Sequence, residues 1–257
     1  MINCTQHNSL NQTMSDMESL GEVFFTVHQI AACLGNAIDA RDPFTSTHSR
    51  QVADLSRCLA IKAGLPTRQV EIIHIAGHMH DIGKIGIPDR ILCKNGPLTP
   101  EEWKMMWLHP VIGARIVAPV KILNGITGIS KLILHHHERF DGKGYPDGLK
   151  ADKIPFGARI MSLTDSISAM LEDRPYRKRL TLSQTMDQIQ QGSGTQFDPD
   201  LSTIMLDMLD DAGSEFEMCS TRTLVTRIIC RKVMDNCNRN GCCRAHRAGS
   251  SDTLFNP

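Results

Sequence analysis

Apolar residues recur at helical spacing along most of this chain, and this period limits the available folds more than any other feature. Between residues 20 and 38 they occupy positions i, i+3, i+4 and i+7, the stripe of an amphipathic helix. No segment alternates apolar and polar residues with the period of two that marks a strand. The sequence therefore predicts an all-α fold, a multi-helix bundle with long functional loops.

Helix start and stop signals divide the chain further. Thr99-Pro100-Glu101-Glu102 is a helix start, with proline at the first position and acids in the first turn. Two close glycines in the segment 81–86 oppose a helix and predict a turn, and a glycine-rich loop is expected at 141–148. Further helices are expected from a cap at Thr45 or Ser46 to about residue 63, and near 67–80, 109–117, 126–138, 155–171, 182–191 and 199–210.

Composition changes at both ends suggest three parts. We expect a flexible leader at 1–16, one domain at 17–211, and a flexible, Cys-rich extension at 212–257. The extension holds five of the nine cysteines: Cys219, Cys230, Cys237, Cys242 and Cys243. A zinc or redox role for them is an alternative, but their spacing matches no common structural zinc pattern.

Overall charge excludes some classes of partner. Lys plus Arg and Asp plus Glu are equal, at 28 each, so no global field attracts DNA or a membrane surface. The first residues lack the apolar core of a signal peptide, and no stretch is long and apolar enough to span a bilayer. We therefore expect no DNA partner, no membrane insertion and a cytoplasmic location with reduced thiols.

Several histidines and acids lie at predicted helix ends or on inward helix faces. They are His48, His80, Asp81, His136, His137 and Asp165. For any single histidine, a hydrogen-bonded core side chain is the simpler interpretation. Burying all of these groups together is costly unless a shared metal ion removes the cost. Mixed nitrogen and oxygen ligands favour Fe, Mn, Zn or Ni over Ca or Mg.

The segment His80–Pro88 resembles the HD motif of the HD superfamily of metal-dependent phosphohydrolases. The segment His136–Leu149 resembles the extended HHE…GYP motif of the HD-GYP subfamily. Thr99–Pro110 and Asp173–Arg177 match that subfamily as well, and the resemblance covers about residues 20–211 in the family's order. It implies an HD-type bundle.

The resemblance also implies roles for individual residues. Asp81 would bridge two metal ions, and Lys84 would neutralise charge on the attacked phosphate. The implied ligands are His48, His80, Asp81, His109, His136, His137 and Asp165. Gly144 and Tyr145 of the GYP loop would line the substrate site, and Arg174 and Arg177 would contact phosphate or base.

By this resemblance the protein is a phosphodiesterase that opens a cyclic dinucleotide, cyclic di-GMP first, to linear pGpG and onward to GMP. The implied mechanism is in-line attack by a hydroxide that bridges the metals. Three alternatives are a module that binds metal and dinucleotide but signals through contacts, a phosphodiesterase for cyclic GMP-AMP, and a general HD phosphohydrolase. The GYP loop argues against the last.

Two positions depart from the family's pattern. Phe44 replaces a glutamate that holds a third metal in some members, so we expect two metals, iron or else manganese. Ser168 replaces an aspartate that helps to hold the lysine after HD, so we expect Lys84 to be less well oriented and turnover to be lower. We expect regulatory input to come from a separate sensor or diguanylate-cyclase partner or from the tail. His74, His78 and His135 are interpreted as structural or exposed, and no role follows for His28.

Overall fold

The computed structural model describes residues 25–42, 47–121, 128–173, 178–216 and 222–239. A first helix occupies residues 25–41. The other α-helices are α2 (His48–Lys62), α3 (Thr67–Met79), α4 (Asp89–Leu92), α5 (Pro100–Met106), α6 (His109–Val117), α7 (Ile129–His135), α8 (Phe156–Met170), α9 (Leu182–Gly192), α10 (Pro199–Phe216) and α11 (Arg222–Arg239). Two 3₁₀ turns, η1 (Ile82–Gly86) and η3 (Ala151–Lys153), complete them. Since these residues contain helices and no strand, the predicted all-α class is confirmed.

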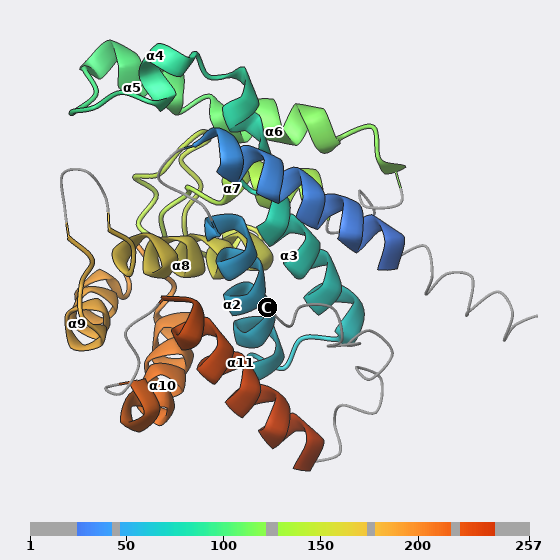
Figure 1. Cartoon of the computed structure of the whole chain (residues 1–257), viewed down its shortest axis with the longest axis vertical. Coiled ribbons are helices and arrows are strands. Elements are labelled where there is room, and N and C mark those ends of the chain that lie inside the picture. Colours follow the sequence, from blue (N-terminus) through green and yellow to red (C-terminus); the bar gives the residue numbers. More distant parts are fainter. Residues whose placement is uncertain (1–24, 43–46, 122–127, 174–177, 217–221, 240–257) are drawn as a thin grey trace, which may run out of the picture.

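Helix α2 lies at the centre of the bundle (Figure 1). It packs against α3, α8, α10 and α11, while α6 packs against both η1 and α7. The core residues at these contacts include Leu55, Leu59, Ile75, Ile133 and Leu163. Burying such a stripe is the main force that holds an amphipathic helix in place.

Start signals explain where several helices begin. In α5 the Thr99 hydroxyl accepts from the Glu102 N–H and the Glu102 carboxylate accepts from the Thr99 N–H, which forms a capping box at the predicted helix start. Pro66 and Pro155 each precede a helix, α3 and α8. The predicted turn after His80 is the 3₁₀ turn η1. The short helix α4 was not predicted.

The carboxyl-terminal part differs from the predicted boundary at residue 212. Helix α10 continues to Phe216, and α11 packs on α2 and α10. Ala212, Ile228, Ile229 and Val233 lie in the same hydrophobic core as the central helices. Described residues on both sides of position 212 therefore pack in one hydrophobic core. The predicted leader at 1–16 and residues 240–257 lie outside the described residues.

No helix in the described ranges combines the length and the hydropathy needed to cross a bilayer.

Candidate metal centre

Six of the seven predicted ligands meet because the helices that carry them begin or end at one place, and Asp165 joins them from the interior of a helix. His48 is the first residue of α2, His109 is the first of α6, and Asp165 lies within α8. The other four follow directly on helix ends: His80 and Asp81 after α3, and His136 and His137 after α7. A helix end presents side chains without a further turn to cover them, so several helices can converge on one small volume.

The ligand atoms form two groups. His48, His80 and Asp165 make one group, and His109, His136 and His137 make the other, each with its ligand atoms within 4.8 Å of one another. His48 Nε2 lies 3.0 Å from Asp165 Oδ1. Such spacing suits a single transition-metal ion in each group.

Asp81 lies between the two groups and faces each with a different oxygen. Its Oδ2 is 3.3 Å from His80 Nε2 and 4.0 Å from His48 Nε2, while its Oδ1 is 3.2 Å from His109 Nε2. Because both oxygens of one carboxylate are presented to separate sets of imidazoles, Asp81 has the position that a bridging ligand needs.

Backbone carbonyls orient three of the imidazoles. The Nδ1 atoms of His80, His109 and His136 lie 2.8, 2.8 and 2.6 Å from the carbonyl oxygens of Gly77, Met106 and Ile133. A carbonyl can only accept, so each Nδ1 donates a hydrogen, and Nε2 is the ring nitrogen that is left to face a metal.

The donor set fits a metal ion on two further grounds. His80 Nε2 is buried and faces the carboxylates of Asp81 and Asp165, at 3.3 and 3.8 Å. Burial, together with the neighbouring imidazoles, lowers the pKa of His137 to about 3 and holds that of His136 well below its usual value. Both rings are then neutral at pH 7, the form that ligates metals.

Lys84 is held by two carboxylates at the edge of this centre. Its Nζ lies 2.8 Å from Asp81 Oδ2 and 3.2 Å from Asp42 Oδ2. Arg41 donates to the carbonyl oxygens of Lys84 and Ile87 and so secures the same turn. Asp42 and Arg41 were not predicted as functional residues, because a carboxylate and a cation at a helix end carry no periodic signal.

Ser168 does not act on Lys84 in the way that the sequence suggested. Its hydroxyl donates to Gln51 Oε1 at 3.1 Å and accepts from His48 Nδ1 at 3.0 Å. Lys84 has Asp42 as its second anionic partner instead. The serine therefore orients a predicted metal ligand, and the expected loss of orientation at Lys84 is not what the contacts indicate.

Known proteins resemble both this sequence and this fold. A family model described as HD domain matches residues 32–201. The chain belongs to the HD domain family. This chain is 38% identical over 202 residues to a cyclic di-GMP phosphodiesterase of Thermotoga maritima. The alignment covers 75% of this chain and 54% of that protein. The chain is 37% identical over 192 residues to the cyclic di-GMP phosphodiesterase response regulator RpfG of Xanthomonas campestris, covering 74% and 50%.

A solved structure of the HDG"Y"P protein Bd1817 from Bdellovibrio bacteriovorus superimposes on the HD domain with a TM-score of 0.52. The two are 20% identical, and the match covers 65% of this chain and 54% of that one. This superposition shows that the two proteins share the HD-type helical fold. The chain spans about half the length of the curated relatives that it matches.

Hydrogen bonds to the Glu138 side chain hold the GYP loop of this HD domain in place. The Glu138 carboxylate accepts from the N–H groups of Asp147 and Leu149 at 2.8 and 3.1 Å. Gly144 packs so closely on Glu138 and its neighbours that a Cβ there would lie 2.5 Å from Glu138 Cα. The loop thus has a fixed shape, and it places the Tyr145 ring in a stack on His137, with centroids 4.9 Å apart.

Three positions named from the HD-GYP resemblance cannot be placed. Phe44, Arg174 and Arg177 lie outside the described residues. Of the histidines left without a role, His135 contacts Asp147 of the GYP loop at 2.9 Å. His74 and His78 lie away from the seven predicted ligands, beside His28.

Proposed function

We propose that this HD domain is a metal-dependent phosphodiesterase that hydrolyses cyclic di-GMP to linear pGpG and onward to GMP. The observation that carries the proposal is Asp81, with one carboxylate oxygen toward each group of imidazoles and Lys84 against its Oδ2. Both sequence relatives bear the name of a cyclic di-GMP phosphodiesterase, which supports the choice of substrate.

The centre would hold two divalent metal ions, iron or else manganese. His48, His80 and Asp165 would bind one ion and His109, His136 and His137 the other, with Asp81 shared. Imidazole and carboxylate together suit these metals. When bound, two such ions supply a nucleophile from water at neutral pH and stabilise charge on phosphate oxygens.

Lys84 and the carboxylates around it have separate tasks in this reaction. Hydrolysis adds water across one phosphodiester: a new bond forms to phosphorus, and the departing ribose oxygen leaves with a proton. Lys84 would bind a non-bridging phosphate oxygen and neutralise the charge that develops there. Its side chain is 16% exposed and that of Asp165 is 18% exposed, so a phosphate can reach both. Asp42 would keep the ammonium in position.

Aromatic side chains beside the centre suit a purine base. Tyr145 lies between His137 and Trp107, and its ring centroid is 5.6 Å from that of Trp107. Trp107 is 43% exposed, although a large apolar side chain is usually buried. Stacking on such a ring contributes about 1–3 kcal/mol per base. Trp107→Ala is therefore expected to raise KM for the dinucleotide about tenfold or more while kcat changes little.

We further propose that the protein acts in the cytoplasm and receives its input from a separate sensor or diguanylate-cyclase partner. The free thiols of Cys33, Cys58, Cys93 and Cys230 suit a reducing compartment.

The test is turnover by metal-loaded protein. Protein purified without oxygen is analysed for metal and incubated with cyclic di-GMP, beside Asp81→Ala. About two iron or manganese ions per chain and linear product from the wild type alone would support the proposal. Cyclic GMP-AMP is added together with cyclic di-GMP. If cyclic GMP-AMP is hydrolysed faster, it is the substrate in place of cyclic di-GMP. Bound metal and dinucleotide without product would favour a signalling module, and a folded protein that binds no metal would refute the centre.

A further inference from the structure

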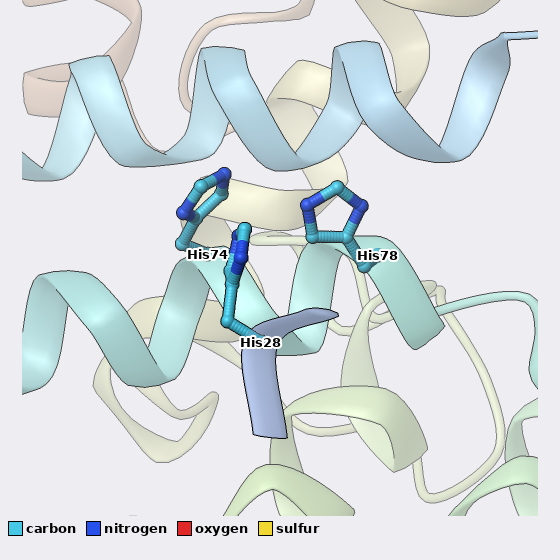
Figure 2. A group of neighbouring side chains, drawn as sticks. All are labelled: His28, His74 and His78. Carbon is cyan, nitrogen blue, oxygen red and sulfur yellow. The ribbon is translucent and has the colours of Figure 1, made fainter. Parts of the chain in front are cut away.

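A second group of histidines lies apart from the seven predicted ligands. His28 projects from the helix at 25–41, and His74 and His78 project from α3 one turn apart (Figure 2). One ligand atom from each lies within 4.8 Å of the others. The ring centroids are 4.6 Å apart for His28 and His74, 5.0 Å for His28 and His78, and 5.1 Å for His74 and His78.

The helical period separates this group from the catalytic centre. His74 and His78 are four residues apart, so they share one face of α3. His80 follows two residues later and turns toward Asp81, on another side. No role in phosphodiester hydrolysis follows for the three histidines, so an explanation for them has to come from elsewhere.

Hydrogen bonding accounts for only part of the group, since His74 bonds to Asp54 while a buried nitrogen of His28 has no partner in the described part of the chain. His28 Nε2 is buried and has no hydrogen-bond partner among the described residues. An unpaired polar atom in the interior costs free energy, and a metal ion is one partner that removes this cost. His74 Nε2 lies 3.3 Å from Asp54 Oδ1, so a carboxylate from α2 reaches the same group.

The chemistry of these atoms selects a class of metal. Imidazole is a ligand that zinc, copper, nickel and iron accept, and two histidines at i and i+4 on a helix are a common pair in zinc sites. Burial, with His74 nearby, lowers the pKa of His28 to about 4, so this ring does not have to lose a proton at neutral pH before it binds.

We propose that His28, His74 and His78 form a second transition-metal site, best suited to Zn²⁺, that joins the helix at 25–41 to α3. Three imidazoles bind the ion, and the fourth position is left to Asp54 or water. The helix at 25–41 leads directly into Arg41 and Asp42, which secure Lys84 and its turn. A metal ion in this site therefore holds the helix at 25–41 in place, and with it Arg41 and Asp42, which contact Lys84 and its turn.

The test compares His28→Leu with Gln29→Leu, which makes the same replacement at the next, exposed position of the same helix. Metal-stripped full-length protein is loaded with Zn²⁺ alone, and bound zinc is counted by mass spectrometry. Wild type and Gln29→Leu are expected to retain one zinc per chain more than His28→Leu. Excess Zn²⁺ is expected to raise Tm further in the first two than in His28→Leu.

A second variant identifies His28 as a ligand directly. His28→Cys loaded with Co²⁺ is expected to gain a thiolate-to-cobalt charge-transfer band, which the wild type and Gln29→Cys lack. Equal zinc content in wild type and His28→Leu would overturn the proposal, and so would a Co²⁺ spectrum of His28→Cys without that band. Because the cobalt spectrum does not depend on turnover, these results are separate from the test of the catalytic centre.

Discussion

Single hydrogen bonds decide how the predicted ligands present their nitrogens. Three imidazoles are oriented by backbone carbonyls, which no side-chain substitution removes. His48 is different, because its Nδ1–H is accepted by the Ser168 hydroxyl, which in turn donates to Gln51. The orientation of this one ligand is therefore open to mutation.

Ser168→Ala tests this orientation. The change leaves the Nδ1–H of His48 without its acceptor in the interior, which costs about 1–3 kcal/mol of stability. Loss of such a supporting hydrogen bond weakens metal binding about 10–100-fold. We expect a folded protein with a lower metal affinity, measured by titration with Mn²⁺ after metal removal.

The control is Ser166→Ala, which removes a hydroxyl from the same helix. The Ser166 hydroxyl donates to the Ser162 carbonyl oxygen and accepts from Gln196, and neither hydrogen bond involves a predicted ligand. Its metal affinity should equal that of the wild type. If both variants bind metal as the wild type does, the Ser168 hydroxyl has no part in orienting His48.

Asp42→Asn tests the support of Lys84. The amide keeps the size of the side chain but removes the charge that lies 3.2 Å from the ammonium. We expect kcat for cyclic di-GMP to fall about ten- to a hundredfold, because the lysine is less well positioned, while metal content stays unchanged. Asp89→Asn is the matched control, since Asp89 pairs with Arg41 and is largely exposed. Equal kcat values in Asp42→Asn and Asp89→Asn would show that Asp42 does not position Lys84.

At the scale of helices and loops, much of the centre followed from the sequence. Helical phase put His48 on the inward face of α2, and the two glycines after His80 marked the turn that carries Lys84. Contacts between distant segments could not be predicted in this way. Asp42 meets Lys84 and His28 meets His78 only once the helix at 25–41 is packed, and no local pattern encodes that packing. The signal of α11 was hidden because its many Arg and Cys residues obscured the apolar face that Ile228, Ile229 and Val233 bury.

The contact between η1 and α6 sets the separation of two ligands. A Cβ on Gly83 would lie 1.9 Å from the His109 carbonyl oxygen, a backbone atom that cannot move alone. Gly83→Ala should therefore push α6 away and separate His109 from Asp81, with loss of bound metal and of activity. Gly86→Ala, in the same turn, meets only the end of the Ile112 side chain at 3.0 Å and should retain both. Metal analysis of the two proteins checks this prediction, and full metal content in Gly83→Ala would contradict it.

Across the whole molecule, the predicted ligands connect segments that are far apart in the sequence. They run from His48 to Asp165 and come from α2, α6, α8 and the residues that follow α3 and α7. Such a centre brings together carboxylates and imidazoles in the interior, where like groups are costly to hold without a cation between them. The metal ions then contribute to the stability of the fold as well as to the reaction.

Metal removal is therefore expected to lower Tm. A ligand at a hundred times its Kd stabilises the folded state by about 2.7 kcal/mol per site. For a domain of this size each kcal/mol corresponds to about 2–4 °C, so chelation should lower Tm by about 5–10 °C for each site emptied. Calorimetry with and without a chelator measures the shift, and re-addition of Mn²⁺ should restore it. Asp165→Ala should respond less to the chelator, because one group of ligands is already incomplete; an undiminished response there would mean that the stabilising metal lies elsewhere in the molecule.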